Sequence, residues 1–253
     1  MKTSWQKWVA FGDNHGWLGD RSAQDALVRF LDRWKPQHRI HVGDAFDFGA
    51  LRRGISCNES QAYDDLEDDL LQGFSFLEKV RPTVLLLGNH DHRVFNTASN
   101  HANGVVRMAA REVCDRIKKT CKRYKTKLVP YHYDKGVYRL AAGRLGFVHG
   151  YTANMNSVGG HASHFGEGHG SAIIMGHLHR IEMQSGKRHS GTVGYSIGCL
   201  CDYAAMDYAA HRLATAQWKH GFAFGVVKGG AYQVWVAQKM GSQWVLPTGV
   251  EEL

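Results

Sequence analysis

Apolar side chains in the first part of the chain follow two patterns, one typical of strands and one typical of helices. Residues 8–11 form an apolar run that predicts a buried strand. In residues 22–34 apolar side chains recur every three or four positions, which predicts an amphipathic helix with Ser22 as its cap and Pro36 just beyond its end. Residues 83–87 form a continuous apolar run, which is typical of a strand buried on both faces.

Three further elements complete this half of the chain. A short strand is predicted at Ile40 and Val42. A helix is predicted by an apolar stripe that consists of Tyr63, Leu66, Leu70, Phe74 and Leu77. A second stripe at helical spacing consists of Val106, Ala110, Val113 and Ile117, and we expect it to face the core.

From residue 128 onward the pattern changes to short strands and turns, which predicts hairpins. The predicted turns are 134–136, 142–143 and 229–230. The predicted strands are 145–148, 172–175, 222–227 and 231–236. Helices in the first half and hairpins in the second indicate an α/β protein.

Charged residues gather in two runs. The acidic run, Asp64, Asp65, Glu67, Asp68 and Asp69, lies beside an apolar stripe, so we interpret it as the solvated face of a helix rather than a metal site. The basic stretch, which closes the next helix, consists of Lys118, Lys119, Lys122, Arg123, Lys125 and Lys127. It is either a solvated helix end whose cations suit the helix dipole or a contact for nucleic acid.

Composition permits one domain over residues 1–253, since 43% of the 253 residues are apolar and can form a sizeable core. Lys plus Arg minus Asp plus Glu gives 31 − 23 = +8, which favours polyanionic partners or substrates. The five cysteines are odd in number and lack CxxC spacing, which indicates neither a disulfide framework nor a zinc ribbon and favours a reducing, cytoplasmic setting. Nothing at the start resembles a secretory signal, and we expect no segment that spans a bilayer.

Candidate chemistry lies in short motifs, each of which directly follows a predicted strand. The first is GDNHG, with Asp13 and His15, and the second is GDAFD, with Asp44 and Asp47. GNHD, HG and GHLH follow, and they contribute Asn89, His90, Asp91, His149, His177 and His179. Open α/β sheets bind ligands at the carboxyl ends of their strands, so we expect these side chains to meet there.

The order and spacing of these motifs resemble those of the calcineurin-like metallophosphoesterase superfamily, over roughly residues 9 to 180. The resemblance implies a four-layer α/β/β/α sandwich of two mixed β-sheets. It also implies a centre that binds two divalent metal ions. On this resemblance Asp13, His15 and His179 hold one ion, Asn89, His149 and His177 hold the other, and Asp44 bridges them.

Residue types and the resemblance together indicate the reaction. Carboxylates and neutral imidazoles suit Mn, Fe, Zn or Ni better than Ca, and we expect Mn²⁺. Two such ions lower the pKa of a shared water, so that a metal-bridging hydroxide attacks phosphorus near neutral pH. The resemblance assigns His90 as the general acid, and we expect Asp47 to orient its imidazole and favour its protonated form. Asp91 is expected to support the loop.

The substrate is less closely defined by the sequence. The chain lacks the arginine of GDxxDRG and the glutamate of GNHE that protein phosphatases of this superfamily carry, so a protein phosphatase is disfavoured. GNHD with GHxH is similar to the phosphodiesterase and nuclease branches, which include double-strand-break repair nucleases and small phosphatases of phages and bacteria. Arg52, Arg53 and Arg93 are candidates for clamping substrate phosphate.

We therefore expect a dinuclear-metal-dependent phosphoesterase that hydrolyses a phosphodiester of nucleic acid or nucleotide. One alternative is a phosphomonoesterase that acts on small molecules or phosphoproteins. Another is a nucleic-acid-binding accessory protein whose metal site is structural. Physiological substrate, oligomeric state and pathway stay open at this stage. Histidines outside the motifs, such as His92 and His164, are expected to have surface or structural roles.

Overall fold

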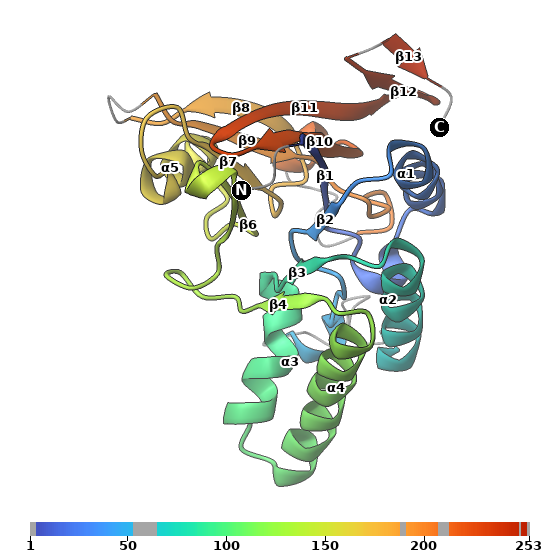
Figure 1. Ribbon diagram of the computed structural model, residues 1–253. Coiled ribbons are helices and arrows are strands. Elements are labelled where there is room, and N and C mark those ends of the chain that lie inside the picture. Colours follow the sequence, from blue (N-terminus) through green and yellow to red (C-terminus); the bar gives the residue numbers. More distant parts are fainter. Residues whose placement is uncertain (1–3, 53–64, 188–190, 207–212, 248, 252–253) are drawn as a thin grey trace.

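The computed structural model describes residues 4–52, 65–187, 191–206, 213–247 and 249–251. Its strands form two mixed sheets that lie face to face (Figure 1). The large sheet has the order β13-β12-β11-β10-β1-β2-β3-β4, and the small sheet has the order β5-β6-β7-β9-β8.

Parallel strands form the half of the large sheet that comes from the first part of the chain. They are β1 (Gln6–Phe11), β2 (His38–His41), β3 (Val84–Leu86) and β4 (Lys127–Val129). The antiparallel half consists of β10 (Gly221–Lys228), β11 (Ala231–Met240), β12 (Gln243–Leu246) and β13 (Gly249–Glu251). Since β10 pairs with β1, the end of the chain completes the sheet that its start begins.

The small sheet contains the strands between residues 138 and 197. They are β5 (Tyr138–Leu140), β6 (Leu145–Val148), β7 (Ala172–Met175), β8 (Ile181–Ser185) and β9 (Val193–Ile197). β6, β7 and β9 are mutually parallel, and β5 and β8 are antiparallel edge strands.

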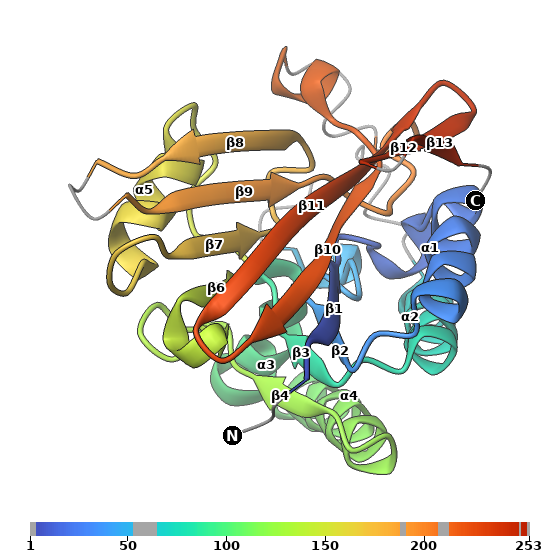
Figure 2. The ribbon, with the colours of Figure 1, turned by 45° about the horizontal axis from the view of Figure 1, so that its top comes forward.

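Helices cover the outer faces of both sheets. They are α1 (Arg21–Trp34), α2 (Leu66–Val80), α3 (Asn89–Asn100), α4 (Gly104–Arg123) and α5 (Ser157–Phe165). Figure 2 shows α5 over the small sheet and α1 with α2 at the opposite side of the molecule, against the large sheet. The resulting four-layer α/β/β/α arrangement confirms the predicted fold.

Alternation along β1 explains why the layers hold together. Successive side chains of a strand point to opposite faces. Trp8 and Ala10 therefore join the core between the two sheets, where Trp8 meets Phe147 edge to face at 5.5 Å. Val9 and Phe11 join a second core beneath α1 and α2. Both cores exclude water, so the apolar run at residues 8–11 is buried on both faces as its composition predicts.

The structure corrects several sequence-based expectations. The cap of α1 is Asp20 rather than Ser22, since the Asp20 carboxylate accepts from Ala23 N at 2.7 Å. The strand predicted at Ile40 and Val42 ends at His41. The turn at 134–136 joins β4 to β5 in different sheets, so it closes no hairpin. The hairpins around 142–143 and 229–230 are confirmed.

The acidic run is only partly solvated. Asp65, Glu67 and Asp68 are exposed, whereas Asp69 is 2% exposed and lies on the core side of α2, so that its assignment to the wet face was wrong. Asp64 and Tyr63 lie outside the described residues. No helix in the described part of the chain is both long enough and apolar enough to cross a membrane.

Candidate metal centre

The predicted ligands follow the carboxyl ends of strands in both sheets. Asp13 and His15 come after β1, Asp44 after β2 and Asn89 after β3. His149, His177 and His179 come after β6 and β7 of the small sheet. Because these strand ends meet where the two sheets face each other, segments up to 164 residues apart in sequence come into contact, as in the His15–His179 pair.

The backbone is strained at most of the predicted ligands. Asp13, His15, Asp44, His177 and His179 all have positive φ, between 49° and 69°. Residues with a side chain rarely adopt this left-handed region, and such strain persists only where the surroundings enforce it. Here the loops hold each other, since Asp13 N donates to Gly43 O at 2.9 Å and His15 N donates to Asp44 O at 3.0 Å.

Asp13, His15 and His179 form one cluster. His179 Nε2 lies 3.4 Å from Asp13 Oδ1, and it lies 3.2 Å from His15 Nε2. All of these side chains are buried, with at most 4% of each residue exposed. The carboxylate of Asp13 also accepts from His177 N at 3.0 Å, which ties this cluster to the next motif.

Asn89, His149 and His177 form a second cluster. His149 Nε2 and Asn89 Oδ1 are 2.9 Å apart, and ligand atoms of Asp44, His149 and His177 lie within 4.8 Å of one another. Asp44 lies between the two clusters, since its Oδ2 is 3.2 Å from His149 Nε2 and 3.8 Å from His15 Nε2. The structure thus brings the predicted ligand side chains close together.

Second hydrogen bonds fix the direction in which the imidazoles point. His149 Nδ1 is 3.0 Å from Val42 O, and His15 Nδ1 is 2.8 Å from the Asp47 carboxylate. Both contacts place a proton on Nδ1, so Nε2 is the ring nitrogen that faces the centre. Metal-bound histidines in proteins are usually anchored in this way.

In the centre, the carboxylates attract positive charge, whereas burial and neighbouring histidines oppose it. Burial alone would raise the pKa of Asp44, but the charges of His149 and His90 hold it well below its usual range. Burial would likewise lower the pKa of His149, but Asp44 outweighs it and raises the pKa to about 9. Nearby His177 has its pKa lowered to about 3, chiefly by burial and then by His149, so its imidazole is neutral. The same carboxylates stabilise a cation, and the oxygen and imidazole donors fit a divalent metal ion.

Asp47 contacts two histidines at once. Its Oδ1 is 2.8 Å from His15 Nδ1 and 2.9 Å from His90 Nδ1, while its buried Oδ2 has no partner among the described residues. Burial opposes charge on His90, but Asp44 and Asp47 prevail and raise its pKa. Asp47 therefore contacts both the predicted general acid and a predicted metal ligand.

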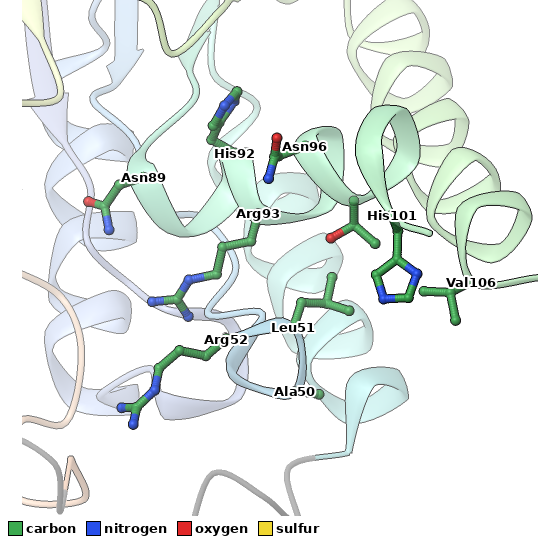
Figure 3. Close-up of a pocket in the computed structure, with 10 residues that line it drawn as sticks. Ala50, Leu51, Arg52, Asn89, His92, Arg93, Asn96, His101 and Val106 are labelled. Carbon is green, nitrogen blue, oxygen red and sulfur yellow. The ribbon is translucent and has the colours of Figure 1, made fainter. Parts of the chain in front are cut away.

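The predicted substrate arginines differ in their surroundings. Arg93 Nη1 donates to Asp47 O at 3.0 Å, and its Nη2 lies 3.2 Å from His90 Nε2. Arg52 lines the same groove, and Figure 3 shows both guanidinium groups extended toward the side on which Asn89 lies. Arg53 lies outside the described residues.

Two buried carboxylates hold the loops that carry the predicted ligands. Asp91 accepts from Gly88 N at 2.9 Å, Phe46 N at 3.0 Å and Ala45 N at 3.3 Å, so it supports the loop as predicted. Asp69 accepts from Asp47 N at 3.0 Å and from Phe48 N at 2.8 Å. Burial raises the pKa of Asp69 to about 6 and, with help from Asp44, that of Asp91 to about 7.

Cys201 is a neighbour of the centre that the sequence did not indicate. Its Sγ lies 3.8 Å from His179 Nδ1, on the opposite side of the imidazole from Asp13. Trp218 packs on the same imidazole at 4.3 Å. The CxC spacing of Cys199 and Cys201, whose thiols contact each other, was the available signal, but only the fold shows that β9 carries it to His179.

The chain matches a family profile and is similar to solved structures. The family profile described as Calcineurin-like phosphoesterase matches residues 7–181. Comparison with curated protein sequences gives no match. Vacuolar Protein Sorting 29 from Cryptosporidium parvum is similar in structure, with a TM-score of 0.51, 11% identity and 98% of each chain covered.

Two bacterial structures are also similar to the chain. A metallophosphoesterase from Sphaerobacter thermophilus has a TM-score of 0.44 and 13% identity, over 91% of this chain and 87% of its own. A conserved predicted phosphoesterase from Streptococcus pneumoniae has a TM-score of 0.37 and 12% identity, over 100% of this chain and 99% of its own.

Proposed function

Because the chain belongs to the calcineurin-like phosphoesterase family, whose members are metal-dependent phosphoesterases, we propose that it hydrolyses phosphodiesters of nucleic acid or nucleotides. The observation that carries the proposal is the convergence of buried Asp and His side chains from both sheets beside an arginine-lined groove. Carboxylates and imidazoles bind cations, and guanidinium groups bind phosphate, so both halves of a metal-assisted phosphoester site are present.

We propose two divalent ions, most favourably Mn²⁺, with Fe, Zn and Ni as alternatives. Asp13, His15 and His179 would hold one ion, Asn89, His149 and His177 the other, and Asp44 would be shared. When bound, such ions lower the pKa of a water molecule and neutralise charge on the phosphoryl oxygens.

The roles proposed for the remaining side chains follow from their contacts. His90 Nε2 is the atom that would give a proton to the leaving oxygen, because Nδ1 is held by Asp47. Arg93 Nη2 lies 3.2 Å from that Nε2, and because a guanidinium can only donate, an ester oxygen would have to replace this contact before it accepts from both groups. Asp47 would fix the His90 ring and, through His15, one side of the metal centre.

The two alternative functions differ in which simple phosphate esters the protein would hydrolyse. A phosphomonoesterase would prefer p-nitrophenyl phosphate, and a nucleic-acid-binding accessory protein with a structural metal would hydrolyse neither ester. The sequence favours a diester because GNHD followed by GHxH is similar to the phosphodiesterase and nuclease branches and the net charge is +8. The missing GDxxDRG arginine and GNHE glutamate disfavour a protein phosphatase. A cytoplasmic setting remains a prediction from the cysteine pattern.

The test compares bis-p-nitrophenyl phosphate with p-nitrophenyl phosphate in the presence of Mn²⁺. We expect the wild type to prefer the diester and Asp44→Ala to be inactive. His90→Ala should lose most activity on a poor leaving group and less on p-nitrophenolate, which needs little help from an acid. Activity on neither ester would overturn the proposal in favour of the accessory role, and a strong monoester preference would replace it with a phosphatase.

A further inference from the structure

A groove extends from the metal centre along α3. Ten residues line it, and its volume is about 840 Å³. Asn89, a proposed metal ligand, is at one end, and His101 and Val106 are at the other, where α3 gives way to α4 (Figure 3). The 12 residues of α3 span roughly 18 Å at about 1.5 Å per residue.

The lining of the groove combines hydrogen-bond donors with apolar surface. Arg52, His92, Arg93 and His101 can all donate to anionic oxygens, and none of the ten described lining residues is acidic. Leu51 and Val106 add an apolar wall. This combination suits a ligand that repeats anionic and flat apolar units along its length.

The length of the groove exceeds what one reacting phosphate needs. At roughly 3.4 Å per nucleotide of a stacked strand, 18 Å corresponds to about five nucleotides. A mononucleotide at the metal centre would leave His101 and Val106 without contact. A duplex would present only phosphates to the apolar wall, whereas a single strand can turn its bases toward it.

Aromatic side chains continue this surface beside the metal centre. Tyr131 lies 5.6 Å from the ring of His92 and 5.9 Å from that of His149, and it stacks on Tyr151 at 4.9 Å. Tyr131 and Tyr151 are half-buried residues, and Tyr151 also stacks on His161 at 6.0 Å, so Tyr131 is the ring of the two that adjoins the groove residue His92. Base stacking on such rings is tolerant of sequence.

From these observations we infer that the α3 groove binds a single-stranded oligonucleotide of about five nucleotides, with its phosphates against Arg52 and Arg93 and its bases against Leu51 and Val106. This inference rests on the proposed phosphodiesterase function and adds to it the substrate's length and strandedness.

The first experiment measures binding without catalysis. Fluorescence anisotropy with EDTA-treated protein would follow labelled oligothymidylates of two to ten nucleotides and a matched duplex. We expect affinity to rise with length and level off near five nucleotides, with the duplex binding more weakly. Arg52→Gln should make the slope of log affinity against log salt shallower by about 0.7. Lys118→Gln, far from the groove, should leave that slope unchanged.

The second experiment uses a charge placed on α3. Asn96→Glu puts a carboxylate in the groove, and Ser99→Glu puts the same charge on an exposed position of the same helix. We expect Asn96→Glu to lower the ratio of kcat/KM for a ten-nucleotide over a two-nucleotide substrate by about tenfold, since like charges repel. Ser99→Glu should leave this ratio at its wild-type value.

The outcomes separate this inference from the proposed function. Hydrolysis of bis-p-nitrophenyl phosphate with no dependence on oligonucleotide length would overturn the groove and leave the phosphodiesterase standing. Length-dependent binding that Asn96→Glu abolishes, with no hydrolysis of any ester, would support the groove and overturn the phosphodiesterase. Equal binding of duplex and single strand would overturn the inference.

Discussion

The two edges of the parallel half of the large sheet carry different kinds of charge. At the carboxyl edge, after β1, β2 and β3, the side chains of Asp13, Asp44 and Asp47 are buried among histidines. At the amino edge, Lys127 begins β4 opposite Val84 of β3, and the exposed cations that end α4 lie next to it. Buried charges interact strongly with one another, whereas interactions between exposed charges are weakened by water and salt.

This comparison corrects the use of net charge as a guide to the ligand. The basic stretch is the densest run of cations in the sequence, yet the structure places it at the edge opposite the metal centre. Lys118 already pairs with Asp115 at 3.4 Å in solvent, and such pairs contribute little. The groove along α3 carries fewer cations but adjoins Asn89. How close a cation lies to the buried centre is therefore a better indicator of a ligand contact than how many cations a segment carries.

The largest effect should come from the carboxyl edge itself. Asp44→Asn removes the charge that both clusters share while it keeps the shape of the side chain. We expect kcat/KM for the diester to fall by about 10³-fold or more, because a buried charge that holds the centre together is lost. Steady-state kinetics with Mn²⁺ measures this fall in kcat/KM, and circular dichroism checks that the variant is folded. Activity within tenfold of wild type would remove Asp44 from the centre.

A pH-dependent stability should also come from this edge, through Asp69. Burial raises its pKa in the folded state to about 6, against 3.8 in the unfolded chain. The raised value means that the folded state binds the proton more tightly, so Asp69 stabilises the fold below pH 3.8 and loses that contribution as pH rises through about 6. At about 1.4 kcal/mol per pH unit, the change is about 2–3 kcal/mol.

Urea unfolding of wild type and Asp69→Asn between pH 4 and 7 measures this contribution. The free energy of unfolding should fall more steeply with pH in the wild type than in the variant. Parallel pH profiles for the two proteins would show that the Asp69 carboxyl group is not protonated in the fold at pH 5. Asp65→Asn, an exposed residue of the same acidic run, is the matched control and should follow the wild type.

A smaller effect should follow from Cys201, whose Sγ lies 3.8 Å from His179 Nδ1 and within 4.8 Å of a ring nitrogen of His15. Partners of this kind typically change metal affinity or activity by about 10–100-fold, and a contact of 3.8 Å belongs at or below the lower end of that range. We expect Cys201→Ser to weaken Mn²⁺ binding by about tenfold or less, as measured by titration calorimetry. Cys121→Ser, buried in α4 away from the centre, should leave Mn²⁺ affinity unchanged.

The smallest effect should come from the amino edge. Replacing Lys118, Lys119 and Lys122 together by Gln should change oligonucleotide affinity by less than about twofold at 0.15 M salt, because exposed charges far from the ligand are screened within about 8 Å. Fluorescence anisotropy at two salt concentrations measures this change in oligonucleotide affinity. A tenfold loss that disappears at high salt would instead make the basic stretch a nucleic-acid contact.

The sequence located the candidate ligands better than their surroundings, for physical reasons. Each candidate ligand follows an apolar run that predicts a buried strand, so the strand ends could be located without coordinates. Asp69 was missed because its acidic neighbours concealed its helical spacing with Gly73 and Phe76, which also face the core. Cys201 and the contact between Arg93 and His90 depend on how separate segments meet, which spacing within one segment does not encode.

Metal stoichiometry tests the central claim most directly. The protein is stripped with EDTA and dialysed against Mn²⁺, and bound manganese is counted by elemental analysis for wild type and Asp44→Asn. Ligands from both sheets that share one carboxylate predict about two ions per chain in the wild type and weaker retention of both in the variant. No tightly bound manganese, or retention that the Asp44→Asn change does not alter, would contradict the account.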